Sequence, residues 1–427
     1  IQICGLEDDF TRYSDKCLKE SGEVIESVMK ALAPRIGYTG RNCDRYVIFN
    51  PLPWERTELV SGSEGSFVVT LPALGFKAVE AGNKEEAQTN NVFLWQDDGT
   101  EGLVMDSVKR LVTPFYEVYP GEHGGFRLIR DRWDGQDAQS RGRFTSVSLE
   151  KDRATMVEEG HIHNIPYRSE WVFYSFSRRI DWHGELDFNR EQVGRLGESE
   201  PQATVTAFND HEHKLRLRFY PYILPHANGI RDLPFCISET QDPYIEGVYW
   251  TAVSDGNVGV ALLNRGLMGS VHEKDGAFSS VLAFSLPYVW GTRMLEGKYS
   301  YDLGILPFKG HWRQADLHRQ ALEYNFPCIV YRESRLDEPL GEVWTPYEDT
   351  GSGRAILSAL YTRNGKTYAR FYESEGSSTK VSFRWMGKPA RFTQVDLRER
   401  ELCDVGGSVT LGPWQVETLA LGLDKLY

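Results

Sequence analysis

The sequence lacks the cysteine patterns of a metal knuckle or a disulfide-rich domain. Its six cysteines, at positions 4, 17, 43, 236, 328 and 403, form no Cys-x-x-Cys pair and are irregularly spaced. Zinc knuckles and dense disulfide frameworks both need closely and regularly placed thiols. We therefore expect reduced thiols and a cytoplasmic location, where thiols are kept reduced.

The chain also lacks a long hydrophobic run and an excess of basic residues. No apolar stretch approaches the roughly 20 residues of a membrane-spanning helix, and no signal peptide is recognisable. The formal net charge is −13, whereas nucleic acids and anionic membranes are bound through clustered Lys and Arg. We therefore expect neither as a partner. Because Ile1 is not Met and the first residues read as the interior of a longer chain, we expect a fragment or a processed piece.

A β–α–β rhythm is missing as well, which argues against Rossmann and TIM-barrel folds. Residues 18–32 show the apolar spacing of an amphipathic helix, which Pro34 and Gly37 end. From Arg45 onward, short β-branched and aromatic runs alternate with clusters of Gly, Asp, Asn and Pro, interrupted by one helical run at 315–324. The sequence therefore predicts an all-β protein preceded by a short N-terminal helix.

Changes in composition divide the chain into four segments. Residues 1–42 read as the terminal helix of an upstream helical bundle, 43–82 as a small β-domain, 92–330 as a large β-domain, and 331–427 as a C-terminal β-sandwich. Two large sheets packed face to face would accommodate the third segment.

Two local patterns inside these segments make sharper predictions. Charged and apolar residues alternate from Lys214 to Phe219, which predicts a strand with one wet and one buried face. Asn364-Gly365 lies between two apolar runs, 356–361 and 367–372, which predicts a β-hairpin.

The most informative stretch is residues 303–327. An aromatic strand runs into Gly310-His311-Trp312, a helical run follows, and Pro327 ends it because proline cannot continue the backbone ladder. This order resembles the signature found late in the large β-domain of glycoside hydrolase family 38, the zinc-dependent retaining α-mannosidases. Further segments resemble parts of that family's C-terminal half in the expected order: 47–56, 71–77, 156–160 (its Glu-Glu-Gly turn), 179–188, 213–219, 260–266, 394–399 and 413–421.

The resemblance covers about residues 44–427 and implies both a fold and a function. The fold would be a large β-supersandwich, similar to galactose mutarotase, flanked by small β-sandwiches. The chain would support and complete the active-site cleft of an N-terminal catalytic domain that it does not contain. In the family the nucleophilic Asp and the zinc ligands precede the matched region. No catalytic residue, metal ligand or cofactor is therefore assigned to this chain, and zinc is expected in the missing domain.

The resemblance also names partners and site residues. The implied partners are the family 38 catalytic domain and a mannose-containing glycan, while self-association is left open. Arg265 and Asn264 fall in a loop that reaches toward the catalytic pocket in the family. A guanidinium is always charged and offers five donors to hydroxyls, and an amide can both donate and accept. Trp133 and Trp290, in other loops, are candidates for stacking on a sugar.

A metal site of the chain's own is an alternative. His161 and His163 would share one face of a strand, which suits a metal. His211 and His213 form a second such pair, and His183 is a further imidazole. Nothing in the sequence joins these segments into the three ligands that a catalytic zinc needs.

Two other functions remain open from the sequence. A large β-domain rich in Trp and Tyr could be a stand-alone carbohydrate-binding module. A mutarotase-like sugar isomerase would need a His acid and a Glu base to open a sugar ring. The candidates for that pair are His163 or His213 as the acid and Glu158, Glu159 or Glu246 as the base.

Overall fold

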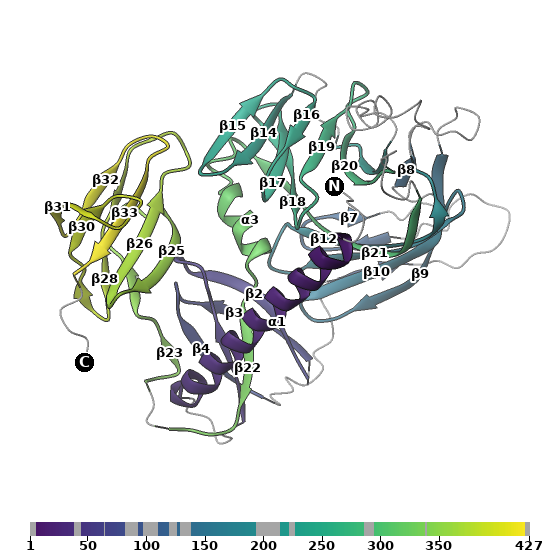
Figure 1. Ribbon diagram of the computed structural model, residues 1–427. Coiled ribbons are helices and arrows are strands. Elements are labelled where there is room, and N and C mark those ends of the chain that lie inside the picture. The colour runs from purple at the N-terminus through teal and green to yellow at the C-terminus, as the bar shows by residue number, and fades with distance from the viewer. Residues whose placement is uncertain are drawn as a thin grey trace. The chain divides into compact units, whose positions relative to one another are not determined.

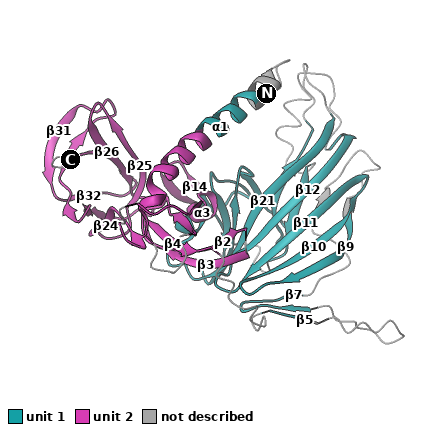
Figure 2. Cartoon of the chain, turned by 90° about the horizontal axis from the view of Figure 1, so that it is seen from below, with its two compact units in different colours: residues 1–20, 86–231, 239–321 teal, residues 21–85, 232–238, 322–427 magenta. Residues whose placement is uncertain are grey.

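The computed structural model describes residues 6–37, 44–63, 65–81, 93–96, 110–118, 126–128, 138–193, 214–221, 227–285, 294–337 and 340–422. The chain forms two compact units, which Figure 2 shows in different colours. Unit 1 comprises residues 1–20, 86–231 and 239–321, and unit 2 comprises residues 21–85, 232–238 and 322–427. Strands dominate both units, which confirms the predicted all-β class.

A 14-stranded sheet forms most of unit 1, and its described pairings are antiparallel. Figure 2 shows its long strands β9 to β12 and β21 side by side. The strand order is β15 (Cys236–Thr240), β14 (Asn228–Leu233), β17 (Trp250–Ser254), β18 (Val258–Asn264), β21 (Leu295–Lys309), β12 (Ile180–Glu191), β11 (Ile165–Tyr174), β10 (Arg153–Ile162), β9 (Ala138–Leu149), β8 (Phe126–Leu128), β13 (Leu215–Phe219), β20 (Phe278–Ala283), β19 (Gly269–His272) and β16 (Tyr244–Glu246). A second, small sheet contains β5 (Leu94–Gln96), β6 (Arg110–Val112) and β7 (Glu117–Val118).

The large sheet encloses one hydrophobic core between its two halves. Trp182 and Phe188 from β12 share a cluster of buried side chains with Leu217 from β13 and Phe278 from β20. The alternation along β12 explains this placement, because Leu186 and Phe188 are buried while Asp187 between them is exposed. The predicted β-supersandwich is therefore confirmed in this unit.

Strand β13 differs from its prediction, because its charged face is buried too. Lys214, just before the strand, is 7% exposed, and Arg216 and Arg218 are 3% and 9% exposed. The strand lies inside the sheet between β8 and β20, and Glu273 lies 3.5 Å from Arg216 and 2.7 Å from Arg218. Buried charges are tolerated when they are paired. The alternation predicted the strand correctly, but the prediction that its charged face is exposed to solvent was wrong.

The Gly310-His311-Trp312 segment has a structural role in unit 1. Trp312 is 3% exposed and lies against Trp250, with ring centroids 6.3 Å apart. The indole Nε1 of Trp250 donates to Nδ1 of His318 over 3.3 Å. Burial lowers the pKa of His318 to about 4, so this imidazole is neutral near pH 7. His318 belongs to helix α3 (Leu317–Asn325), which ends before Pro327 as predicted.

The predicted N-terminal helix is also confirmed, as α1 (Leu6–Leu32), followed by the 3₁₀ turn η1 (Ala33–Arg35). Of its predicted apolar stripe, Met29 is buried, whereas Val24, Ile25 and Val28 are exposed. Among the helices that the structure describes, none is long and apolar enough to cross a lipid bilayer.

Unit 2 contains a small four-stranded sheet in the order β22 (Ile329–Glu333), β1 (Arg45–Phe49), β4 (Phe76–Glu80) and β23 (Val343–Trp344). It joins segments on both sides of the predicted boundary at residue 331, and β2 (Arg56–Gly62) and β3 (Gly65–Leu71) form a separate hairpin. Arg45 is 1% exposed on β1. Its Nε donates to the carbonyl oxygen of Ile36 over 2.9 Å, and one Nη donates to that of Arg335 over 2.8 Å. This guanidinium therefore ties the end of η1 to the sheet.

The C-terminal part of unit 2 is a β-sandwich (Figure 1). Its core contains Phe371, Phe383, Phe392 and Leu419. The predicted hairpin at Asn364-Gly365 is confirmed. Both turn residues have positive φ, 50° and 75°, which Asn-Gly adopts readily in two-residue turns. The strands are β25 (Ile356–Arg363), β26 (Lys366–Tyr372), β33 (Val416–Leu421), β30 (Phe392–Val395) and β31 (Glu401–Gly406) in one sheet; β24 (Tyr347–Asp349), β28 (Phe383–Trp385) and β29 (Lys388–Pro389) in another; and β27 (Thr379–Val381) with β32 (Val409–Leu411).

Candidate functional site

The loop that the sequence singled out begins at the end of β18 in unit 1. Asn264 is 2% exposed. Its Nδ2 donates to the carbonyl oxygen of Gly247 over 3.3 Å, and its Oδ1 accepts from the backbone N–H of Gly266 over 3.2 Å. Gly266 has φ of +100°, a conformation that favours glycine. The buried side chain of Asn264 therefore stabilises the turn through these two hydrogen bonds. The next residue, Arg265, is exposed.

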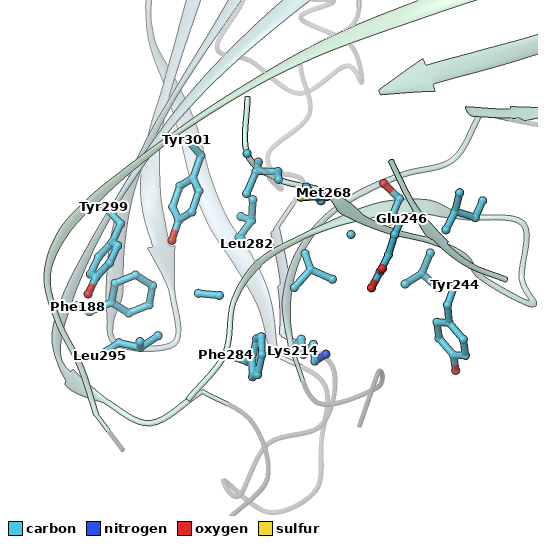
Figure 3. A pocket seen from close by; sticks show the side chains of 18 residues that line it. Phe188, Lys214, Tyr244, Glu246, Met268, Leu282, Phe284, Leu295, Tyr299 and Tyr301 are labelled. Atoms are coloured by element: carbon cyan, nitrogen blue, oxygen red, sulfur yellow. The ribbon is translucent and has the colours of Figure 1, made fainter. Parts of the chain in front are cut away.

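A cavity of about 500 Å³ lies next to this loop. Strands β12 and β21 provide one side of it, and β16, β19, β20 and the loop provide the other (Figure 3). Its volume is in the usual range of small-molecule sites, about 300–1,000 Å³. The described residues that line it are Phe188, Lys214, Tyr244, Ile245, Glu246, Gly266, Leu267, Met268, Gly269, Ser270, Val271, Val281, Leu282, Ala283, Phe284, Leu295, Tyr299 and Tyr301.

Aromatic side chains mark one side of the cavity. Tyr299 and Tyr301 alternate along β21, and Figure 3 shows both beside Phe188. Tyr299 is 42% exposed and meets Phe188 edge to face, with centroids 5.4 Å apart. Tyr301 is 9% exposed. Burial, and secondly the neighbouring Tyr299, raise the pKa of Tyr301, so its hydroxyl remains a donor at neutral pH.

Few charged groups accompany these rings. The ammonium of Lys214 lies 4.4 Å from the centroid of the Phe284 ring, a cation–π contact. Glu246 lies on the opposite side from Tyr299, near Tyr244 (Figure 3). Sequence reasoning named only Glu246 among the charged and aromatic lining residues as a site candidate. The period-two spacing of Tyr299 and Tyr301 was the available signal for the rest.

Of the histidines proposed as metal ligands, the three that the structure describes, His161, His163 and His183, do not form a metal-binding group. His161 lies near the end of β10, but His163 is in the following turn with φ of 53°. The prediction that both imidazoles share one strand face was therefore wrong. His183 lies on β12, where Nδ1 is 2.9 Å from Oδ1 of Asp302. Within the described ranges no three His, Cys, Asp or Glu side chains are placed to hold a metal. His211, His213, Trp133 and Trp290 lie outside those ranges.

Glu158 is not placed to act as the base beside His163 in a mutarotase-like reaction. Glu158 lies five residues earlier on β10, which is about 16 Å along an extended strand. Glu158 is 3% exposed and accepts a hydrogen bond from the hydroxyl of Tyr167 over 2.5 Å. Glu159 is exposed and lies 4.0 Å from Arg168. The segment 156–160, which resembles a family turn, is part of the continuous strand β10, so its description as a turn was wrong.

The buried carboxyl of Glu158 predicts that the stability of unit 1 depends on pH. Burial raises its pKa, and the hydrogen bond from Tyr167 opposes this only in part. A carboxyl whose folded pKa exceeds its unfolded value contributes stability below the unfolded pKa and loses it as pH rises through the folded pKa. We expect the urea midpoint to fall as pH rises from about 4.3, the usual pKa of a glutamate, through that folded pKa, and Glu158→Gln to flatten the fall.

The exposed residue Glu159, next to Glu158 on β10, provides the control for the predicted pH dependence. Glu159→Gln removes the same charge from the same strand, one residue away, and should leave the pH profile unchanged. Equal pH profiles for the wild type and Glu158→Gln between pH 5 and 8 would show that Glu158 does not titrate in this way.

Comparison with solved structures shows which known proteins share this fold. No family model matches the sequence, and no curated protein matches it. Among solved structures, the chain is similar to an α-mannosidase from Enterococcus faecalis V583, with a TM-score of 0.71 and 11% identity over 97% of this chain and 60% of that one. It is also similar to a protein in glycosyl hydrolase family 38 from Enterococcus faecalis, with a TM-score of 0.60 and 10% identity over 88% of this chain and 52% of that one. The chain thus has the fold of these proteins over less than two thirds of their length.

Proposed function

We propose that this chain is the β-rich portion of a retaining α-mannosidase of glycoside hydrolase family 38. In this proposal it completes the active-site cleft of a catalytic domain that lies outside it. The observation that supports it is the fold shared with an α-mannosidase over 97% of this chain, while 40% of that enzyme's chain has no counterpart here. The order of segments that resemble the family agrees with this fold.

The catalytic chemistry belongs to the other domain in this proposal. A retaining glycosidase needs two carboxyl groups about 5–5.5 Å apart, and none of the described residues is assigned to that pair. The nucleophile and the zinc would therefore come from the catalytic domain, and the substrate would be a mannose-containing glycan. The cytoplasmic location stays a prediction from the cysteine pattern.

Arg265 would be the contribution of this chain to the cleft. Its side chain is exposed, and Asn264 fixes the loop that carries it through two hydrogen bonds. A loop held in one shape loses little conformational entropy when its side chain binds a ligand. An exposed guanidinium on such a loop can donate to sugar hydroxyls or to a carboxylate of the other domain.

The test is hydrolysis of a chromogenic α-mannoside. We expect no turnover by the purified chain alone, with or without added Zn²⁺. We expect turnover by the product of the gene region that encodes this chain together with its catalytic domain. In that enzyme Arg265→Ala should lower kcat/KM about 10- to 100-fold, the loss expected for a hydrogen bond from a charged group.

An exposed arginine elsewhere in unit 1 serves as the control. Arg141 is exposed on β9, and Arg141→Ala should leave kcat/KM unchanged. Turnover by the isolated chain would overturn the proposal, because the chain would then carry its own catalytic groups.

A further inference from the structure

The cavity beside the Asn264 loop has the features of a ligand site within this chain. Its volume of about 500 Å³ exceeds that of a packing defect, and aromatic side chains line it together with a few polar groups. Tyr299, Glu246 and Met268 are exposed, whereas Tyr301 and Lys214 are buried. A ligand would therefore enter past the exposed residues and reach the buried hydroxyl and ammonium.

The charges of the site indicate a neutral ligand. Lys214 contributes one positive charge to the lining and Glu246 one negative charge. The two other cations on the same face of β13 are neutralised locally, because Arg216 pairs with Glu273 and Arg218 with Glu273 and Asp275. The lining thus has no net charge with which to attract an anion or a cation.

The combination of rings and hydrogen-bonding groups indicates the ligand's chemistry. A pyranose ring has C–H faces that pack against aromatic rings and a rim of hydroxyl groups. Tyr299 and Phe284 provide ring surface, while Lys214 and Tyr301 provide donors and Glu246 provides an acceptor. The buried hydroxyl of Tyr301, in an otherwise apolar part of the lining, favours a ligand whose own hydroxyl groups can form hydrogen bonds with it.

We propose that this cavity binds one neutral hexopyranose, such as a mannose unit of a glycan, independently of the catalytic domain. The inference rests on the proposed function for the choice of a mannoside as the probe. It assigns no chemistry to the site, since the sugar is held and released unchanged.

The experiment measures binding of methyl α-D-mannopyranoside to the purified chain by saturation-transfer NMR and by titration. We expect binding in the millimolar range. Tyr299→Ala removes ring surface at the exposed entrance, and Lys214→Met removes the ammonium while keeping the length of the side chain. Each should raise Kd about tenfold or more.

Matched substitutions away from the cavity give the controls. Tyr13 and Lys380 are exposed and do not line the cavity, so Tyr13→Ala and Lys380→Met should leave Kd unchanged. Because Tyr299 is exposed, the Tyr299→Ala variant should fold. It therefore keeps the test valid even if the Lys214→Met variant fails to fold.

Two results would overturn the inference. One is the absence of mannoside binding, including the case in which phenol, an apolar ring of similar size, binds instead. The other is mannoside binding that Tyr299→Ala leaves unchanged. The assay needs no hydrolysis, so its failure leaves the proposed function to be decided by the Arg265 experiment.

Discussion

Replacing Arg45 by methionine is expected to lower the free energy of unfolding of unit 2 by about 3 kcal/mol or more. Methionine fills much of the space of the arginine stem but donates no hydrogen bond. The carbonyl oxygens of Ile36 and Arg335, which accept from this guanidinium over 2.9 and 2.8 Å, would lose a buried partner. The measurement is the urea dependence of hydrogen exchange in β1 and β4, because a chain of two units need not unfold in one step.

Arg332 on the neighbouring strand β22 tests whether the effect comes from burial. Its guanidinium also forms hydrogen bonds, to the carboxylate of Asp44, but its side chain is 48% exposed. Exposed ion pairs contribute little because water and salt screen them. Arg332→Met should therefore leave exchange in β1 nearly unchanged. Similar losses of protection in the two variants would contradict the role given to Arg45.

Glu273→Gln is expected to destabilise unit 1 by about 3–5 kcal/mol, the range for breaking a buried ion pair. Glutamine has nearly the same shape, so the change removes charge and leaves the packing intact. The side chains of Arg216 and Arg218 are 3% and 5% exposed, and both face this carboxylate. Without it, Asp275 is the carboxylate among the described residues that still pairs with Arg218, and its side chain is 50% exposed. The measurement is a urea unfolding curve together with hydrogen exchange in β13 and β20.

Salt dependence separates this buried network from a surface effect. The difference between the wild type and Glu273→Gln should persist in 0.5 M NaCl, since buried pairs are screened much less than exposed ones. Lys274→Gln, at the exposed next residue, gives the control and should change stability little. A difference that disappears in salt would show that the network is effectively at the surface.

The parts of the fold that could be predicted from the sequence were those with a local sequence pattern. The apolar spacing of residues 18–32 identified α1, Pro327 marked the end of α3, and Asn364-Gly365 identified a hairpin turn. These signals depend on residues close together in the sequence, so they predict local structure without knowledge of contacts between distant segments. The shared order of such segments led to the fold that the comparison with an α-mannosidase then confirmed.

The parts that were missed depend on contacts between distant segments. Nothing near Lys214 indicates that its strand lies inside the sheet, or that Glu273 would neutralise the arginines beside it. The cavity combines Phe188, Tyr244 and Tyr299, which come from three separate strands. Their meeting depends on strand order, which short-range periodicity does not contain. Sequence reasoning named Asn264 and Arg265 as site candidates, and this stays a prediction; it did not predict the cavity beside their loop.

The pairing of β1 with β22 constrains how the protein can be made. Arg45 lies opposite Glu333, 288 positions later in the sequence. At a synthesis rate of about 5–20 residues per second, a ribosome needs roughly 14–58 s to produce the intervening chain. During that interval one edge of β1 has no final neighbour, while most of unit 1 is being translated. A nascent β1 therefore relies on β4, or on a chaperone, to keep it from pairing with another chain.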